Sequence, residues 1–276
     1  MLNLTTIDPN EPQADREGPV SLRVNLPVEF HNLYLYVIAD PSSEGTKLAF
    51  APKVEMVLGG SEVGFGAYYH PDRVPRAMLT LSSGFLGIDL FGELEVSLGS
   101  ERRFVEATEI GPENPLGLRT VQYSEQVFTA LTGGLRYTYS AQDRDWSATF
   151  VGQYLWNGEG YEDSDILREN PLGVGRLLIA GDLHPGDLIF PGRHYAAASI
   201  GLSLDRDSEW LLAAFWISNL SDASGRVSPS LTVRPADHFS LRAAASVTYG
   251  EEGAEMTPFG SRVTVSIAAT LGSGRF

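Results

Sequence analysis

The chain has 276 residues, of which 43% are apolar and 20% charged, and it carries a net charge of −15 with no cysteine. This composition indicates a folded chain, and the lack of cysteine excludes disulfides, thiolate metal sites and cysteine nucleophiles. The acidic balance argues against nucleic-acid binding, because phosphate backbones would be repelled. No apolar run reaches the roughly 18 residues of a membrane-spanning helix, although a closed β-barrel can span a bilayer without one.

The chain begins with a polar segment, residues 1–31, which we separate from a main domain at 32–276. Residues 1–18 lack the basic start and apolar core of a signal peptide, so we expect that a secretory signal has been removed or that a longer precursor exists. Residues 20–25 could form an additional strand, interrupted at Pro27. That strand would make the strand count odd, and a further strand would then precede the chain.

From residue 32 onward, apolar residues recur at every second position, which is typical of β-strands with two different faces. In 239–249, for example, Phe239, Leu241 and Val247 alternate with polar Ser240 and Thr248. This alternation predicts twelve strands, at 32–39, 49–58, 62–69, 76–83, 88–98, 127–140, 146–157, 195–204, 210–219, 227–234, 239–249 and 262–271. Many are close to the roughly 9–11 residues that a tilted membrane strand needs.

The connections between these strands alternate in length. The shorter ones are 59–61, 84–87, 141–145, 205–209 and 235–238. The longer ones, between them, are 40–48, 70–75, 99–126, 158–194, 220–226 and 250–260. Outer-membrane barrels have short periplasmic turns and longer extracellular loops, whereas a sandwich has no reason to sort its loops in this way. We therefore predict an all-β fold, an antiparallel up-and-down transmembrane β-barrel of about 12 strands with both ends in the periplasm.

Aromatic residues cluster near the predicted strand ends. Trp146, Trp210 and Phe239 follow short turns, and Trp156 and Tyr249 lie near the opposite ends of their strands. Tryptophan and tyrosine favour the interface between lipid and water. These positions predict two aromatic girdles.

The last strand is amphipathic and the chain ends in Phe276, which resembles the C-terminal assembly signal of Gram-negative outer-membrane proteins. In the usual signal the terminal aromatic residue lies on the same face as the apolar residues of the strand. Here Phe276 has an even number whereas Val263 and Val265 have odd numbers, and a bulge at 272–274 would bring them to the same face. The stretches 32–36 and 152–161 are similar to uncharacterised spirochaete outer-membrane proteins. The resemblance implies an outer-membrane location and recognition by the barrel-assembly machinery through 261–276, and it implies no activity.

No catalytic, metal or cofactor site is predicted. The five histidines lack metal-ligand spacing, and the pairs Asp182/His184 and Asp237/His238 lie in loops without a third partner. Gly173 and Gly175 lie in a loop with no helix after them, so they do not form a phosphate-binding turn. We expect no enzymatic activity.

The best candidate site is the lumen, which would be lined by the polar residues at alternate positions of each strand. The expected lumen-lining residues are Lys53, Glu55, Asp89, Glu93 and Glu95 on the early strands and Arg136, Arg234, Arg242 and Arg262 on the later ones. Acidic and basic walls would face each other and create a transverse field that sets ion selectivity. Alternatively, these charges pair and plug the barrel. The loop 158–194 could fold inward as a constriction or cap the mouth.

These features favour a narrow passive channel for small polar solutes or ions, with membrane lipid as its surroundings. A second hypothesis is a structural or adhesive barrel with a closed lumen, whose outer loops bind a partner. A third is a soluble β-sandwich or a lipocalin-like binder, since alternation alone does not distinguish a lipid-facing surface from a core.

Overall fold

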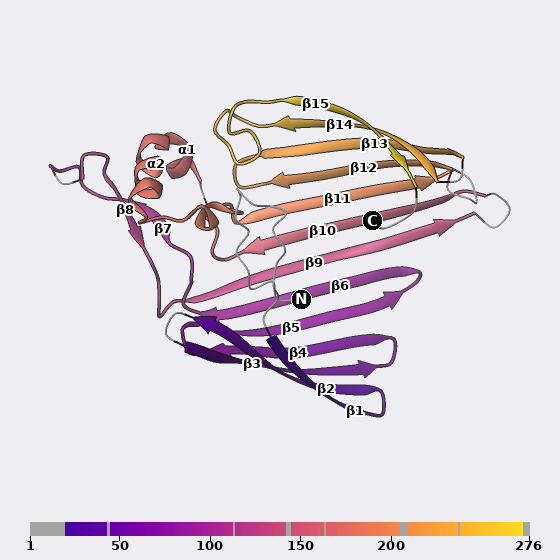
Figure 1. Ribbon diagram of the computed structural model, residues 1–276, viewed down its shortest axis with the longest axis horizontal. Helices are drawn as coiled ribbons and strands as arrows, with labels where there is room; N and C mark the ends of the chain where they lie inside the picture. The colour runs from indigo at the N-terminus through magenta and orange to yellow at the C-terminus, as the bar shows by residue number, and fades with distance from the viewer. Residues whose placement is uncertain are drawn as a thin grey trace.

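A computed structural model describes residues 20–42, 45–112, 114–141, 145–162, 164–204, 209–236 and 238–272 of this all-β protein. Within these ranges, thirteen strands form one sheet in which each strand is antiparallel to its neighbours (Figure 1). The strands are β1 (Val20–Val28), β2 (His31–Ser42), β3 (Gly45–Leu58), β4 (Ser61–His70), β5 (Arg73–Phe85), β6 (Ile88–Leu98), β9 (Val127–Ser140), β10 (Ser147–Asn157), β11 (His194–Ser203), β12 (Trp210–Asn219), β13 (Ser224–Ala236), β14 (Phe239–Tyr249) and β15 (Val263–Leu271). Apart from the excursion between β6 and β9, strands that follow each other in the chain are neighbours in the sheet.

All twelve predicted strands are present, and the sheet contains one more. The additional strand is β1, which includes the 20–25 segment and pairs with β2 along its whole length. Pro27 does not interrupt it, since an edge strand tolerates a residue without an N–H. Among the described residues the sheet therefore begins at Val20, inside the segment that the sequence analysis separates from the main domain, and it has thirteen strands rather than twelve.

The sheet is open. β1 and β15 form its two margins in Figure 1, and along the described parts of the chain neither strand pairs with anything on its outer side. Every residue of both strands is exposed. The closure into a barrel that the sequence predicts is thus not observed.

The connections that are longer than six residues are all at one end of the sheet. At the short-turn end the connections are 29–30, 59–60, 86–87, 141–146, 204–209 and 237–238. At the long-loop end they are 43–44, 71–72, 99–126, 158–193, 220–223 and 250–262. All three long connections share one end, as predicted. The expectation of longer loops at 40–48, 70–75 and 220–226 is wrong, because β2 to β5 and β13 extend further than predicted and leave only 43–44, 71–72 and 220–223 between the strands.

The two longest connections, 99–126 and 158–193, fold together into what we call the loop cluster. It contains the ribbon β7 (Phe104–Ala107) and β8 (Leu118–Val121), the helices α1 (Asp165–Glu169) and α2 (Pro171–Ala180), and the 3-10 turn η1 (Pro185–Leu188). Figure 1 shows the helices and the ribbon beyond the ends of the strands. Val105, Leu118, Val174 and Leu183 are its buried core. Among the described residues, no helix is both long and apolar enough to cross a membrane.

The helix α2 corrects the assignment of Gly173 and Gly175 to a loop. Pro171 occupies the first turn, where a missing N–H costs nothing, and Gly181 ends the helix in the left-handed conformation with a φ of 78°. A Cβ on Gly173 would collide with the Leu118 side chain, so the glycine allows α2 to approach β8. Gly173 is therefore a packing residue, whereas a Cβ on Gly175 would meet nothing within 4 Å.

The strand register gives the sheet one predominantly apolar face, with scattered polar residues such as His31, Ser61, Ser83 and His194 but no Asp, Glu, Lys or Arg. Directly opposite residues on this face, from β1 to β10, are Leu26, Leu33, Val54, Phe65, Leu79, Leu94, Leu131 and Trp156. A matching row from β11 to β15 is Leu202, Leu212, Leu231, Ala243 and Ile267. Many of these side chains are exposed, including Phe65 at 48% and Ile267 at 79%. We call this surface the apolar face and the opposite one the polar face.

Candidate functional site

All charged side chains of the thirteen described strands lie on the polar face, by strand alternation and register. On β1 to β6 they are Arg23, Asp40, Lys47, Lys53, Glu55, Glu62, Arg73, Arg76, Asp89, Glu93 and Glu95. On β9 to β15 they are Arg136, Arg226, Arg234 and Arg242. The polar face therefore has one half with both signs of charge and one half with arginine alone.

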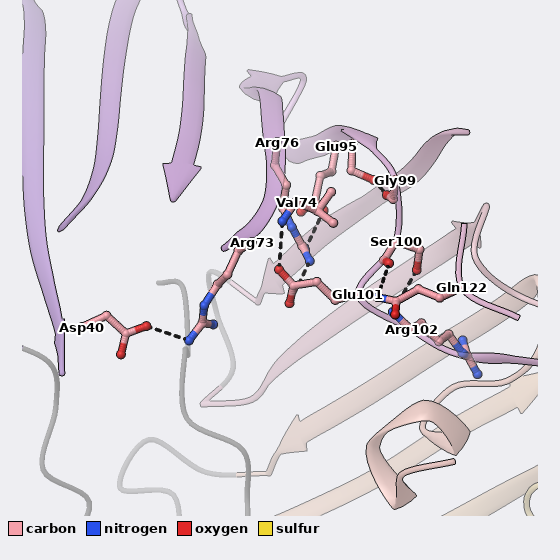
Figure 2. Close-up of polar contacts among 11 residues, drawn as sticks. Asp40, Arg73, Val74, Arg76, Glu95, Gly99, Ser100, Glu101, Arg102 and Gln122 are labelled. Carbon is pink, nitrogen blue, oxygen red and sulfur yellow. Dashed lines mark hydrogen bonds and ion pairs between the residues drawn. The ribbon is translucent and has the colours of Figure 1, made fainter. Parts of the chain in front are cut away.

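Ion pairs neutralise much of the first half near the long-loop end. Figure 2 shows Arg73 reaching Asp40 of β2, with Nη2 3.0 Å from Oδ2. Arg76 donates to Glu95 of β6 at 2.9 Å and lies 3.9 Å from Glu101, whose carboxylate also accepts the Val74 N–H. These pairs connect β2, β5 and β6 to the start of the 99–126 loop.

In the same half, one further ion pair forms within a single strand, and one arginine lies over an aromatic ring. Lys53 Nζ lies 2.6 Å from Glu55 Oε1 on β3. Arg23 of β1 lies over the Tyr34 ring at 4.7 Å, a cation–π arrangement. The predicted lumen residues Lys53 and Glu55 are thus partners of each other.

The other predicted lumen residues occupy several environments. Asp89 and Arg136 are directly opposite on β6 and β9. Glu93, Arg136, Arg234 and Arg242 are exposed on the polar face. Arg262 lies outside β15, in the preceding loop, with its guanidinium 5.0 Å from the Phe259 ring centroid.

Sequence reasoning missed several polar-face charges, above all Arg226. The sequence places the start of its strand at residue 227, whereas β13 begins at Ser224 and sets Arg226 opposite Thr248. Arg226 has the same parity as Arg234, so extending the alternation backwards by one step would have found it.

The five predicted girdle residues lie at the two ends of the strands. Trp210 and Phe239 are on the apolar face at the short-turn end, with Trp146 in the adjacent turn, 5.1 Å from the Tyr139 ring. Trp156 and Tyr249 are on the apolar face at the long-loop end. Trp216 donates its indole N–H to the Tyr249 hydroxyl at 2.8 Å.

A buried polar cluster attaches the 250–262 loop to the sheet at the long-loop end. Glu255 Oε2 accepts the Tyr195 hydroxyl at 2.7 Å and the Asn219 amide at 2.8 Å. Its backbone N–H donates to Asp222 at 2.9 Å. Asn219 and Ser224 are fully buried, so these polar groups must be satisfied within the protein.

Arg102 brings the loop cluster close to this attachment. Its Nη1 donates to the carbonyls of Glu159 and Phe190 at 3.4 and 3.3 Å, and its guanidinium lies about 6 Å from the Phe104 and Tyr161 rings. These contacts join both long loops to one another. The described part of the loop 158–193 packs against 99–126, with Val174 and Leu183 against Val105 and Leu118, and its role as a constriction or a cap stays a prediction.

We predict that the attachment of the 250–262 loop weakens as pH rises. Burial raises the pKa of Glu255, an effect that Asp222 reinforces and that the Tyr195 and Asn219 hydrogen bonds oppose. The folded loop then binds a proton that the detached loop releases, so its stability is fully present below the ordinary carboxyl pKa and is lost through the raised pKa. Hydrogen exchange of 250–262 between about pH 4 and pH 7 should show less protection at the higher pH.

Glu255→Gln should remove this pH dependence while keeping most of the hydrogen bonds. The exposed Glu252 on the same loop supplies a matched control as Glu252→Gln, which should leave the parent profile unchanged. A flat exchange profile in the parent protein would contradict the prediction.

Across the residues the structure covers, no group of three or more His, Asp or Glu side chains could hold a metal ion. The backbone N–H of His184 donates to the Asp187 carboxylate at 2.8 Å. Asp237 of the second predicted pair lies outside the described residues. Comparison with known protein families and with curated proteins finds no match for this chain.

Proposed function

We propose that this chain is a bacterial outer-membrane β-barrel and that its polar face lines a narrow passive channel for small polar solutes or ions. The observation that carries the proposal is the apolar face, which has no charged side chain over thirteen adjacent strands. A charged side chain at the bilayer centre costs several kcal/mol, so a membrane barrel excludes charge from the face in contact with lipid and tolerates it on the face toward the lumen.

Exposure of the apolar face to water would be unfavourable. Soluble monomers rarely expose a contiguous apolar patch of more than a few hundred Å². Here the exposed apolar side chains extend from Val24 on β1, at 51%, through Ile200 on β11, at 44%, to Val265 on β15, at 70%. Because the apolar face has no second sheet packed on it within the described chain, this distribution favours lipid over a sandwich core.

In a bilayer the open edges must also be paired, since no water is present to satisfy their backbone groups. We propose that β1 and β15 meet in the membrane and close the barrel. With thirteen strands in an antiparallel order, β1 and β15 run in the same direction, so this single junction is parallel. Barrels with an odd strand number occur in membranes, although an even number is usual in bacteria.

The proposal includes two partners. Membrane lipid covers the apolar face, and the barrel-assembly machinery receives the C-terminal segment 261–276, of which 273–276 lie outside the described residues. The aromatic residues at both strand ends support a bilayer position, with interfaces near Trp210 and Trp156.

Detergent dependence of the fold tests the membrane part of this proposal. We expect the protein to fold only in detergent or lipid and to migrate faster on a gel before boiling than after. Reconstitution into planar bilayers should then give discrete conductance steps. A folded species in plain buffer would overturn the membrane assignment and favour a soluble binder.

A second candidate is a structural or adhesive barrel that uses the loop cluster to bind a partner. The observation in its favour is the outer surface of α2, where Leu172 and Ile179 are 81% and 91% exposed on a folded unit with its own core. A heat-modifiable barrel without conductance would support this candidate over the channel.

A further inference from the structure

We infer that the polar face of β13 to β15 is an anion-binding track and that the channel therefore selects small anions. This inference rests on the proposed channel and names its solute class: inorganic anions such as chloride and phosphate, and small carboxylates. It is carried by the kind, pairing and spacing of the charged side chains on these strands.

The sign of the charge is uniform over half of the sheet. Among the described strands β9 to β15, the only formally charged side chains are Arg136, Arg226, Arg234 and Arg242. The net charge of −15 therefore arises elsewhere, in the loops, the chain ends and the first half of the sheet. An anion moving along β13 and β14 meets guanidinium groups without a neighbouring carboxylate on these strands.

These arginines also lack the ion pairs that neutralise the other half. Arg73 and Arg76 of β5 each contact a carboxylate at about 3 Å. Arg226, Arg234 and Arg242 are exposed, and no described carboxylate lies within ion-pair distance of any of them. Their fork of N–H donors is therefore available to an anion, for which guanidinium geometry is well suited.

The positions of the arginines define a path between the two ends of the sheet. Arg226 lies opposite Thr248 near the long-loop end. Arg242 lies opposite Thr232 near the short-turn end, and Arg234 is two residues from Thr232 on the same face. Arg234 and Arg242 are thus diagonal neighbours, the arrangement in which long side chains reach each other's ligand.

Hydroxyl groups fill the space between these arginines. Ser228 and Ser246 face each other with their oxygens 3.3 Å apart, and Ser230 and Ser266 flank Ala244 on the two adjoining strands. Hydroxyl protons can donate to an anion as it passes, and they do so without adding charge that would hold it permanently. The track therefore combines two charged steps with neutral donors between them, which suits conduction better than a single tight site.

The first test is the reversal potential of the reconstituted protein under a KCl gradient. We expect a chloride-to-potassium permeability ratio above one. Replacing Arg226, Arg234 and Arg242 singly with Gln should lower the ratio by up to about fourfold each, since a unit charge about 10 Å away in water changes the local chloride and potassium concentrations by about twofold in opposite directions. Replacement with Lys should keep the ratio, and heat-modifiable mobility verifies that each variant folds.

Arg119→Gln is the matched control: it also removes one positive charge, but from β8 of the loop cluster, outside the thirteen-stranded sheet. It should not lower the permeability ratio. Cation selectivity in the parent, or an unchanged ratio after all three Arg→Gln replacements, would overturn the inference while leaving the channel intact.

A second test does not depend on conductance. Phenylglyoxal modifies accessible arginines, and mass spectrometry of the detergent-folded protein gives the rate at each site. Inorganic phosphate should slow modification of Arg226, Arg234 and Arg242 severalfold but not that of the exposed loop residue Arg119, which is paired with Glu106. Absence of protection overturns the anion track, whereas protection without conductance preserves the track and refutes the channel.

Discussion

Ile200→Arg is expected to cost about 2–4 kcal/mol of folding free energy in a lipid bilayer, whereas Ser199→Arg, one residue away, should cost less than about 1 kcal/mol. Both residues are near the middle of β11, an interior strand of the sheet. Ile200 lies on the apolar face opposite Phe150 and Ala214. Ser199 lies on the polar face opposite Val151 and Phe215.

The reason for the difference is the surroundings of the new charge. On the apolar face at mid-strand, the guanidinium would be in hydrocarbon, far from either interface, and its solvation would be lost. On the polar face it would join the arginines of the proposed lumen and stay hydrated. The two variants add the same side chain to the same strand, so strand propensity and net charge cancel in the comparison.

Urea unfolding in lipid vesicles, followed by tryptophan fluorescence, gives the two free energies. If the variants are equally stable, the apolar face is not in contact with lipid. If Ile200→Arg instead improves the solubility of a protein that folds without detergent, the exposed apolar face belongs in water and the barrel proposal fails.

The strands of the sheet were largely predictable, because a strand with two different surroundings repeats every second residue. The alternation in 88–98 and 239–249 needs no knowledge of distant contacts, and β6 and β14 have those bounds in the structure. The strand β1 is harder to predict because Pro27 suggests an interruption, and the sequence does not reveal that the strand is at an edge, where proline is tolerated.

The loops were less predictable, because long-range contacts decide their structure. α2 contains Gly173 and Gly175, which lower helix propensity, and it is stable because Val174 and Leu177 pack with Val105 and Leu118 of the other loop. Those partners are far away in the chain. No local pattern indicates that two loops form a common core.

The same division holds for the candidate site. The alternation along each strand predicts that Lys53, Glu93 and Arg242 share one face, but it does not predict which charged side chains form ion pairs. Pairing depends on register, which aligns Arg76 with the neighbourhood of Glu95 and leaves Arg242 opposite Thr232. The alternation therefore indicates the arginine half, but the ion pairs that neutralise the other half are apparent only once the strands are aligned.

Closure of the sheet should be detectable as an intramolecular disulfide between β1 and β15. The chain has no cysteine, so each engineered pair is free of background. We would combine Val24→Cys on β1 with a single cysteine on the apolar face of β15, at Val263, Val265, Ile267 or Ala269. Paired strands lie about 4.8 Å apart, within the Cα separation that a disulfide spans, so one pair of this set should oxidise to a compact monomer in detergent.

Moving the β1 cysteine then shows the direction of the junction. If β1 and β15 are parallel, the best β15 partner of Leu26→Cys is later in the chain than that of Leu22→Cys; an antiparallel contact reverses this order. Val24→Cys with Leu90→Cys on β6 is the control, since several strands separate the two positions. Disulfides only between two molecules would show that a second copy covers the edges, and the lumen would then have walls from both chains.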